Sequence, residues 1–88
     1  MANTSNVPAS PGAYQLIKNN SVIYVGSADD LNRRYGEWSN SPDNPCVKRS
    51  GFDLFRWQVT QTLAAARQLE LDWYNTFRPV CNLVSPPG

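Results

Sequence analysis

The sequence contains five side chains whose types suit the hydrolysis of a phosphodiester bond: Tyr14, Tyr24, Arg34, Glu70 and Asn82. A helical carboxylate such as Glu70 can hold one divalent cation, since magnesium prefers oxygen ligands and keeps several waters. A guanidinium such as Arg34 can bind phosphate oxygens through its planar fork and offset the charge that develops there. These residue types therefore predict metal-dependent phosphoryl chemistry, provided that the fold brings them together.

A structural explanation of the same residues stays open. At about 100° per residue, Glu70 lies in the middle of one apolar face of the last expected helix, with Leu63, Ala66, Trp73, Tyr74 and Phe77. An inward charge is unfavourable unless it is paired or hydrogen-bonded. Glu70 and Arg34 could therefore form an ion pair in a small core. The tyrosines could likewise serve packing alone, which is the role we expect of Tyr35 and Tyr74.

Three short strands are expected to form the sheet that places the tyrosines. Residues 13–17 and 22–25 are strand-like. Asn19 and Asn20 lie between them and tolerate the positive φ that a tight hairpin requires. A third strand is expected over residues 55–59, in which alternation predicts one buried face formed by Phe55, Trp57 and Val59.

Two longer helices are expected to carry the arginine and the glutamate. Ser27 can cap a helix that contains Arg34 and runs to about residue 38. Thr60 or Thr62 can cap a second helix, which ends near residue 77. The predicted fold class is therefore α/β (α+β), with a small three-stranded mixed or antiparallel sheet flanked by helices.

A short helix is also predicted between these two, with Asn44 as its cap, Pro45 at its first position and Gly51 just past its end. The polar residues 1–10 are expected to form a flexible arm, and residues 85–88 a flexible tail. One domain over residues 11–84 remains between them, which agrees with the modest core that 88 residues can bury.

The composition excludes several kinds of site. The chain has no histidine, which argues against Ser-His or Cys-His catalysis, and its two cysteines, Cys46 and Cys81, lack the spacing of a zinc site. A net charge of +1 means that any basic footprint must be local. Without a membrane-spanning run, the chain is expected to be soluble and cytoplasmic, with reduced thiols.

Two tripeptides, Gly12-Ala13-Tyr14 and Tyr24-Val25-Gly26, give the sequence its most specific resemblance. Together with Arg34, Glu70 and Asn82, they resemble the GIY-YIG nuclease family from about Pro11 to Leu83. The resemblance implies a metal-dependent endonuclease that hydrolyses DNA, in repair or recombination, with one Mg²⁺ or Mn²⁺ ion at Glu70. It further implies that Tyr14 is the general base, that Tyr24 positions water or phosphate and that Asn82 orients the site.

Other residues are expected to contact the nucleic acid, namely Gly26, Ser27, Arg33, Lys48 and Arg49. So small a domain leaves little surface for reading bases, and sequence specificity is therefore expected to need a protein partner or a second copy.

The sequence departs from the family at Trp38, where family members commonly place a histidine or tyrosine that assists proton transfer. An indole N–H donates a hydrogen bond but cannot act as a base. Two readings follow: Tyr14 acts unaided, or the domain is a weak or inactive module that binds nucleic acid. A protein-interaction module that uses the same cleft stays open as well.

Overall fold

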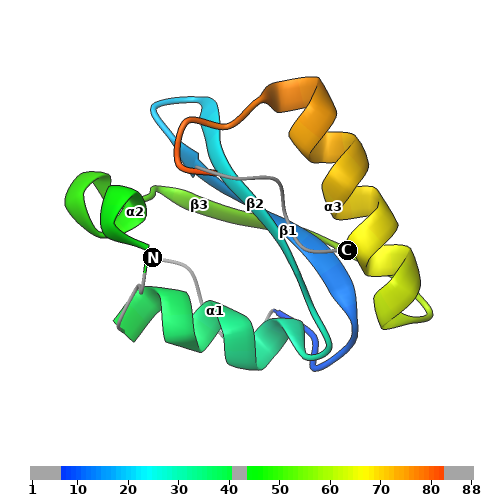
Figure 1. Ribbon diagram of the computed structural model, residues 1–88. Helices are drawn as coiled ribbons and strands as arrows, with labels where there is room; N and C mark the ends of the chain where they lie inside the picture. The colour runs from blue at the N-terminus through cyan, green and yellow to red at the C-terminus, as the bar shows by residue number, and fades with distance from the viewer. Residues whose placement is uncertain (1–6, 41–43, 83–88) are drawn as a thin grey trace.

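The computed structural model describes residues 7–40 and 44–82. Its strands form one antiparallel sheet in the order β2-β1-β3, with β1 at Gly12–Lys18, β2 at Ser21–Ala28 and β3 at Leu54–Val59. Helix α1 lies on one side of this sheet and α3 on the other (Figure 1). The expected three-stranded sheet flanked by helices is thereby confirmed, and all of its strand pairs are antiparallel.

The β1–β2 hairpin turns through Asn19 and Asn20, whose φ angles are 53° and 66°. Both lie in the left-handed region that a tight type I′ turn requires, as the two asparagines predict. The strand pairing continues as far as Gly12 opposite Ala28, which carries β2 past the predicted end at residue 25.

The start of α1, Leu31–Asn40, is a correction to the predicted cap. Ser27 still belongs to β2, and Asp30 caps the helix instead, because its carboxylate accepts a hydrogen bond from the Arg33 amide at 3.0 Å. Continued pairing with β1 keeps Ser27 extended, and its hydroxyl is therefore free for another partner.

The residues just before β1 also pack against α1. Val7 is only 4% exposed, and the carbonyls of Pro8 and Ser10 accept hydrogen bonds from the Asn32 and Leu31 amides. Residues 7–10 thus differ from the expected flexible arm, because they satisfy the first amides of a helix. The remainder of the arm, residues 1–6, and the tail, 85–88, lie outside the described residues.

Helix α2, Pro45–Ser50, begins and ends as predicted. The Asn44 side chain accepts hydrogen bonds from the Cys46 and Val47 amides, and Gly51 closes the helix with φ of 70°. Cys46 forms a disulfide with Cys81, and the expectation of reduced thiols is therefore wrong for this structure. The fold brings the two Cα atoms to 5.3 Å although 35 positions separate them in sequence.

Helix α3, Leu63–Phe77, starts at Thr62, whose hydroxyl accepts a hydrogen bond from the Ala65 amide. Ala66 and Glu70 are its buried residues, as their shared face predicts. Phe77 was expected on that face but is 45% exposed. It is the last residue of the helix, and the chain turns away immediately after it at Arg78, whose φ is 47°.

The main apolar cluster lies between the sheet and α1, and Tyr14, Tyr35, Trp38 and Phe55 provide its aromatic rings. The predicted buried face of β3 is only partly correct, because Phe55 is buried whereas Trp57 is 37% and Val59 44% exposed. β3 is an edge strand, and α1 packs mainly on β1 and β2. None of the described helices is long and apolar enough to span a membrane.

Candidate active site

The two tripeptides meet across the β1–β2 pair, where Tyr14 lies directly opposite Gly26. A Cβ atom on Gly26 would overlap the Tyr14 ring. The glycine therefore makes room for the phenol ring, and its expected contact with nucleic acid stays a prediction. Tyr24 also belongs to this cluster, with its ring centroid 6.4 Å from that of Tyr14 and 5.0 Å from that of Trp38.

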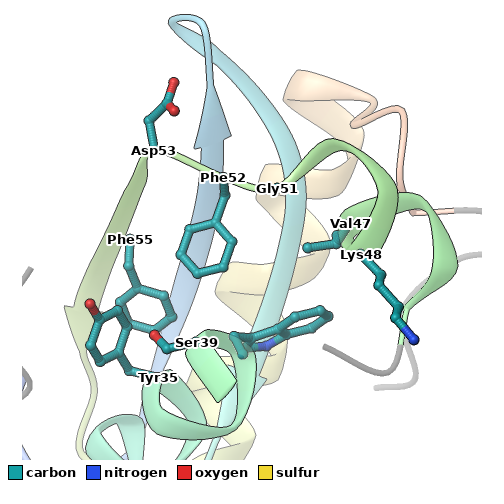
Figure 2. A pocket seen from close by; sticks show the side chains of 9 residues that line it. Tyr35, Ser39, Val47, Lys48, Gly51, Phe52, Asp53 and Phe55 are labelled. Atoms are coloured by element: carbon teal, nitrogen blue, oxygen red, sulfur yellow. The ribbon is translucent and has the colours of Figure 1, made fainter. Parts of the chain in front are cut away.

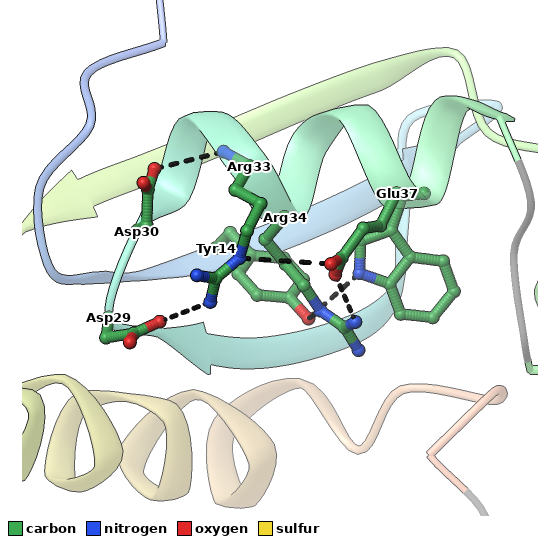
Figure 3. A network of polar contacts seen from close by, with 7 residues as sticks. Tyr14, Asp29, Asp30, Arg33, Arg34 and Glu37 are labelled. Carbon is green, nitrogen blue, oxygen red and sulfur yellow. Dashed lines mark hydrogen bonds and ion pairs between the residues drawn. The ribbon is translucent and has the colours of Figure 1, made fainter.

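The Tyr14 hydroxyl is the centre of a polar network next to α1 (Figure 3). Arg34 Nε donates a hydrogen bond to it at 3.2 Å and Trp38 Nε1 donates another at 2.9 Å. A neutral phenol oxygen has two lone pairs, and both are used by these donors.

The pKa of Tyr14 is raised above its ordinary value of 10.0, chiefly because the residue is buried. The positive charge of Arg34 and the hydrogen bonds from Arg34 and Trp38 act to lower the pKa, but they do not outweigh burial. In the free protein Tyr14 is therefore neutral at pH 7.

Arg34 forms an ion pair with Glu37, with 2.8 Å between Nη1 and Oε1. Its guanidinium also lies over the Trp38 ring, 5.1 Å from the centroid. The alternative of a structural ion pair between Arg34 and Glu70 is not supported, because no such pair occurs among the contacts of the described residues.

Glu70 faces the opposite side of the sheet from Tyr14, on α3, and is 4% exposed. One carboxylate oxygen accepts a hydrogen bond from the Ser27 hydroxyl at 2.6 Å. Ser27, which does not cap α1, therefore uses its hydroxyl to bind Glu70. Burial raises the pKa of Glu70 above its ordinary value, while the Ser27 bond and the charge of Arg67 lower it. Within the described part of the chain, no cation forms an ion pair with this carboxylate.

This environment fits a single hard cation. A buried carboxylate without a counter-ion carries uncompensated negative charge, which a divalent cation would neutralise. No group of three or more His, Cys, Asp or Glu residues that could hold a metal is found in residues 7–40 and 44–82. One carboxylate completed by waters and substrate oxygens suits magnesium in particular.

Asn82 lies against the free edge of β2. Its Oδ1 accepts a hydrogen bond from the Val25 amide at 2.9 Å, and its Nδ2 donates one to the Val25 carbonyl at 3.1 Å. Val25 is flanked by Tyr24 and Gly26, and the amide group therefore fixes the strand segment that carries the second tripeptide.

The other residues that are expected to bind nucleic acid lie in two places. Arg33 and Ser27 line a hollow of about 380 Å³ next to the site, together with Ala28, Asp29, Arg34, Glu37, Leu63 and Arg67. Lys48 lines a separate hollow of about 370 Å³ with Ser39, Val47 and Phe55 among its walls (Figure 2). Lys48 and Arg49 lie on α2, and Lys48 shares its hollow with Trp38, whose indole donates to the Tyr14 oxygen. Their contact with nucleic acid stays a prediction.

Two residues that line the hollow next to the site, Arg67 and Glu37, were not predicted from the sequence as site residues. Arg67 is exposed on α3, where an arginine is ordinary and gives no signal by itself. Glu37 pairs with Arg34 three positions earlier. That helical spacing could have revealed Glu37, because residues three apart are neighbours on a helix.

The site combines a hydrogen-bonded tyrosine, Tyr14, on the α1 side of the sheet with a single buried carboxylate, Glu70, on the α3 side. The GIY-YIG catalytic domain family matches residues 10–83. The chain therefore belongs to this family, and the expected enzyme class, an endonuclease, is confirmed at the level of the family.

Bacterial relatives agree with this assignment to the family. UvrABC system protein C of Aquifex aeolicus (strain VF5) is 30% identical over 86 residues, which cover 94% of this chain and 15% of that protein. The protein of the same name from Arthrobacter sp. (strain FB24) is 29% identical, over 92% of this chain and 13% of that protein. The chain thus spans less than one sixth of these relatives.

Among solved structures, the GIY-YIG N-terminal endonuclease domain of UvrC from Thermotoga maritima, bound to its catalytic magnesium, is similar with a TM-score of 0.78. The two sequences are 28% identical, and the match covers 91% of each chain. A point mutant of the same domain, also with its divalent cation, gives a TM-score of 0.79.

Proposed function

We propose that this protein is a divalent-metal-dependent endonuclease that hydrolyses phosphodiester bonds in DNA. Two observations carry the proposal. The Tyr14 hydroxyl accepts hydrogen bonds from Arg34 and Trp38, and the buried carboxylate of Glu70 has no ion-pair partner among the described residues. Magnesium is the proposed cation and Glu70 its protein ligand. When bound, the cation polarises the phosphate and stabilises the leaving oxygen.

Arg34 is proposed to bind the phosphate that is cleaved. Its guanidinium is held at one end by the Tyr14 oxygen and at the other by Glu37. A planar fork can exchange a carboxylate for a phosphate, because both offer two oxygens at similar spacing. Glu37 is half-exposed and can leave the guanidinium without a buried charge being stranded.

Tyr14 is proposed as the general base, which must be ionised to accept a proton from water. The two donors on its oxygen, Arg34 Nε and Trp38 Nε1, both stabilise the phenolate. Trp38 is thus a positioning residue in this scheme, since it holds the tyrosine without exchanging a proton. Tyr24 is proposed to position water or phosphate, and Asn82 to hold the strand that carries Tyr24 in place.

A second candidate function is a DNA-binding module with little or no catalysis. The observation that favours it is the raised pKa of Tyr14, since a neutral phenol cannot serve as the base. Trp38, which lies 2.9 Å from the Tyr14 oxygen, cannot substitute for it.

A plasmid assay separates these functions. Purified protein is incubated with supercoiled plasmid and Mg²⁺ or Mn²⁺, with EDTA in a parallel sample, and DNA binding is followed by fluorescence anisotropy. Metal-dependent nicking supports the nuclease. DNA binding without nicking supports the second candidate, and the absence of both contradicts the two proposals together.

The cellular setting is proposed from the relatives alone. Their name places them in the UvrABC system, and a role in DNA repair with a partner that supplies specificity is the corresponding proposal here. A cytoplasmic location stays a prediction.

A further inference from the structure

The hollow beside the site is bounded by arginines from two different helices. Arg33 and Arg34 come from α1, and Arg67 comes from α3 on the other side of the sheet. At about 380 Å³ the hollow holds roughly a dozen waters at ~30 Å³ each, and a phosphate group with its hydration fits within it.

These arginines differ in whether an acid already neutralises them. Arg33 pairs with Asp29 at 2.6 Å, and Arg34 pairs with Glu37 at 2.8 Å. Arg67 makes no hydrogen bond or ion pair with any of the described residues. An incoming anion must therefore displace a carboxylate before it can bind Arg33 or Arg34. At Arg67 it displaces no side chain of the described residues.

We propose that Arg67 binds a backbone phosphate of DNA next to the phosphate that is cleaved, and that this hollow is the subsite for it. The proposal rests on the proposed nuclease function. It adds a contact from α3, which would hold the DNA strand across both helices.

The position of Arg67 supports this assignment. It precedes Glu70 by one helical turn, and residues three apart share a helix face. Ser27, which donates its hydroxyl to Glu70, lines the same hollow, and the hollow therefore adjoins the proposed metal ligand. The charge of Arg67 also lowers the pKa of the Glu70 carboxyl group.

Because the net charge is low, a single arginine can contribute a large share of the affinity for DNA. With a net charge of +1, the protein has no strong overall attraction for DNA, and affinity must come from individual cations near the strand. Each neutralised phosphate releases counterions, so that each such contact adds about one to the salt dependence of binding.

The test compares Arg67→Gln with Arg56→Gln. Arg56 is also exposed and lies on β3, the strand at the edge of the sheet away from β2. The two variants remove the same charge. Binding of a fluorescent duplex of ~20 base pairs is measured by anisotropy at several salt concentrations with Ca²⁺. Thermal melting checks that both variants remain folded.

We expect Arg67→Gln to weaken binding at low salt by about 5- to 20-fold and to reduce the salt slope by about one, while Arg56→Gln stays within about twofold of the parent. Arg67→Lys should recover most of the slope because it restores the charge. A parent that nicks plasmid, with an Arg67→Gln variant that keeps the parental slope, overturns this inference alone. An Arg67→Gln variant that lowers nicking but binds DNA like the parent also overturns this inference alone. A parent that neither binds nor nicks DNA overturns the proposed function as well.

Discussion

The α1 side and the α3 side of the site are built in different ways. On the α1 side, Tyr14 is 1% exposed and Trp38 2%, and the tyrosine oxygen has both lone pairs occupied. On the α3 side, Glu70 has one hydrogen bond from Ser27, and Arg67 has no hydrogen bond or ion pair with the described residues. The difference suggests that the α1 side is assembled by folding, whereas the α3 side is completed by the cation and the DNA that bind there.

Glu70→Gln should have the largest effect on activity and the smallest on the fold. Glutamine keeps the shape and can still accept the Ser27 hydrogen bond, but it removes the charge that a metal needs. We expect nicking of supercoiled plasmid to be lost, because the cation loses its protein ligand, with DNA binding retained.

The stability of this variant follows from the sign of the Glu70 pKa shift. A raised carboxyl pKa means that the group favours folding below its ordinary pKa of 4.5 and that this contribution is lost as pH rises through the folded pKa. Glu70→Gln should therefore melt at the parental temperature or above it at pH 7. A steep loss of melting temperature at pH 7, in a parent that does not nick DNA, would contradict the catalytic role.

Tyr14→Phe should affect both activity and stability, because it acts on the assembled side. Removal of a general base lowers the rate by roughly 10²- to 10⁴-fold. The Trp38 N–H also loses its acceptor while buried, at a cost of about 1–3 kcal/mol in the free energy of unfolding. Tyr35→Phe is the matched control, since Tyr35 serves packing against Phe55 and should retain full nicking. Equal nicking by the two variants would remove Tyr14 from the mechanism.

The change of nicking rate with pH should be smaller than the losses of rate in these variants, but it tests the role of Tyr14 as the base. The pKa of Tyr14 is raised, and the reactive phenolate is therefore a minor species whose population grows about tenfold per pH unit below that pKa. Single-turnover nicking should rise from about pH 7 to about pH 9 without a plateau. A flat profile over this range, with chemistry shown to be rate-limiting, would contradict the base role of Tyr14.

Local sequence signals predicted the parts of the fold that depend on neighbouring residues. The asparagine turn, the Asn44 cap and the Thr62 cap each depend on groups within a few positions. The same signals failed at Ser27, which has the side chain of a helix cap but is held in β2 by pairing with Ala13. Tertiary pairing overrides a local capping preference, and the sequence alone does not reveal which of the two prevails.

The site was predictable where motif spacing carried information. Tyr14, Tyr24 and Asn82 lie along one region of the β1–β2 pair, and their roles in the site stay predictions. The disulfide of Cys46 with Cys81 and the position of Arg67 were not predictable, because each depends on how distant elements pack.

The most direct test of the contrast between the two sides is calorimetric titration of Mg²⁺ into the Tyr14→Phe protein, which leaves DNA intact, with and without a short duplex. A matched control carries Glu70→Gln in addition. Because magnesium gains most of its affinity from substrate oxygens when one carboxylate serves it, we expect little heat without DNA. Saturable binding should appear with the duplex and be lost in the control. A tight, stoichiometric site in the free protein, or binding to the complex that survives Glu70→Gln, would contradict the account.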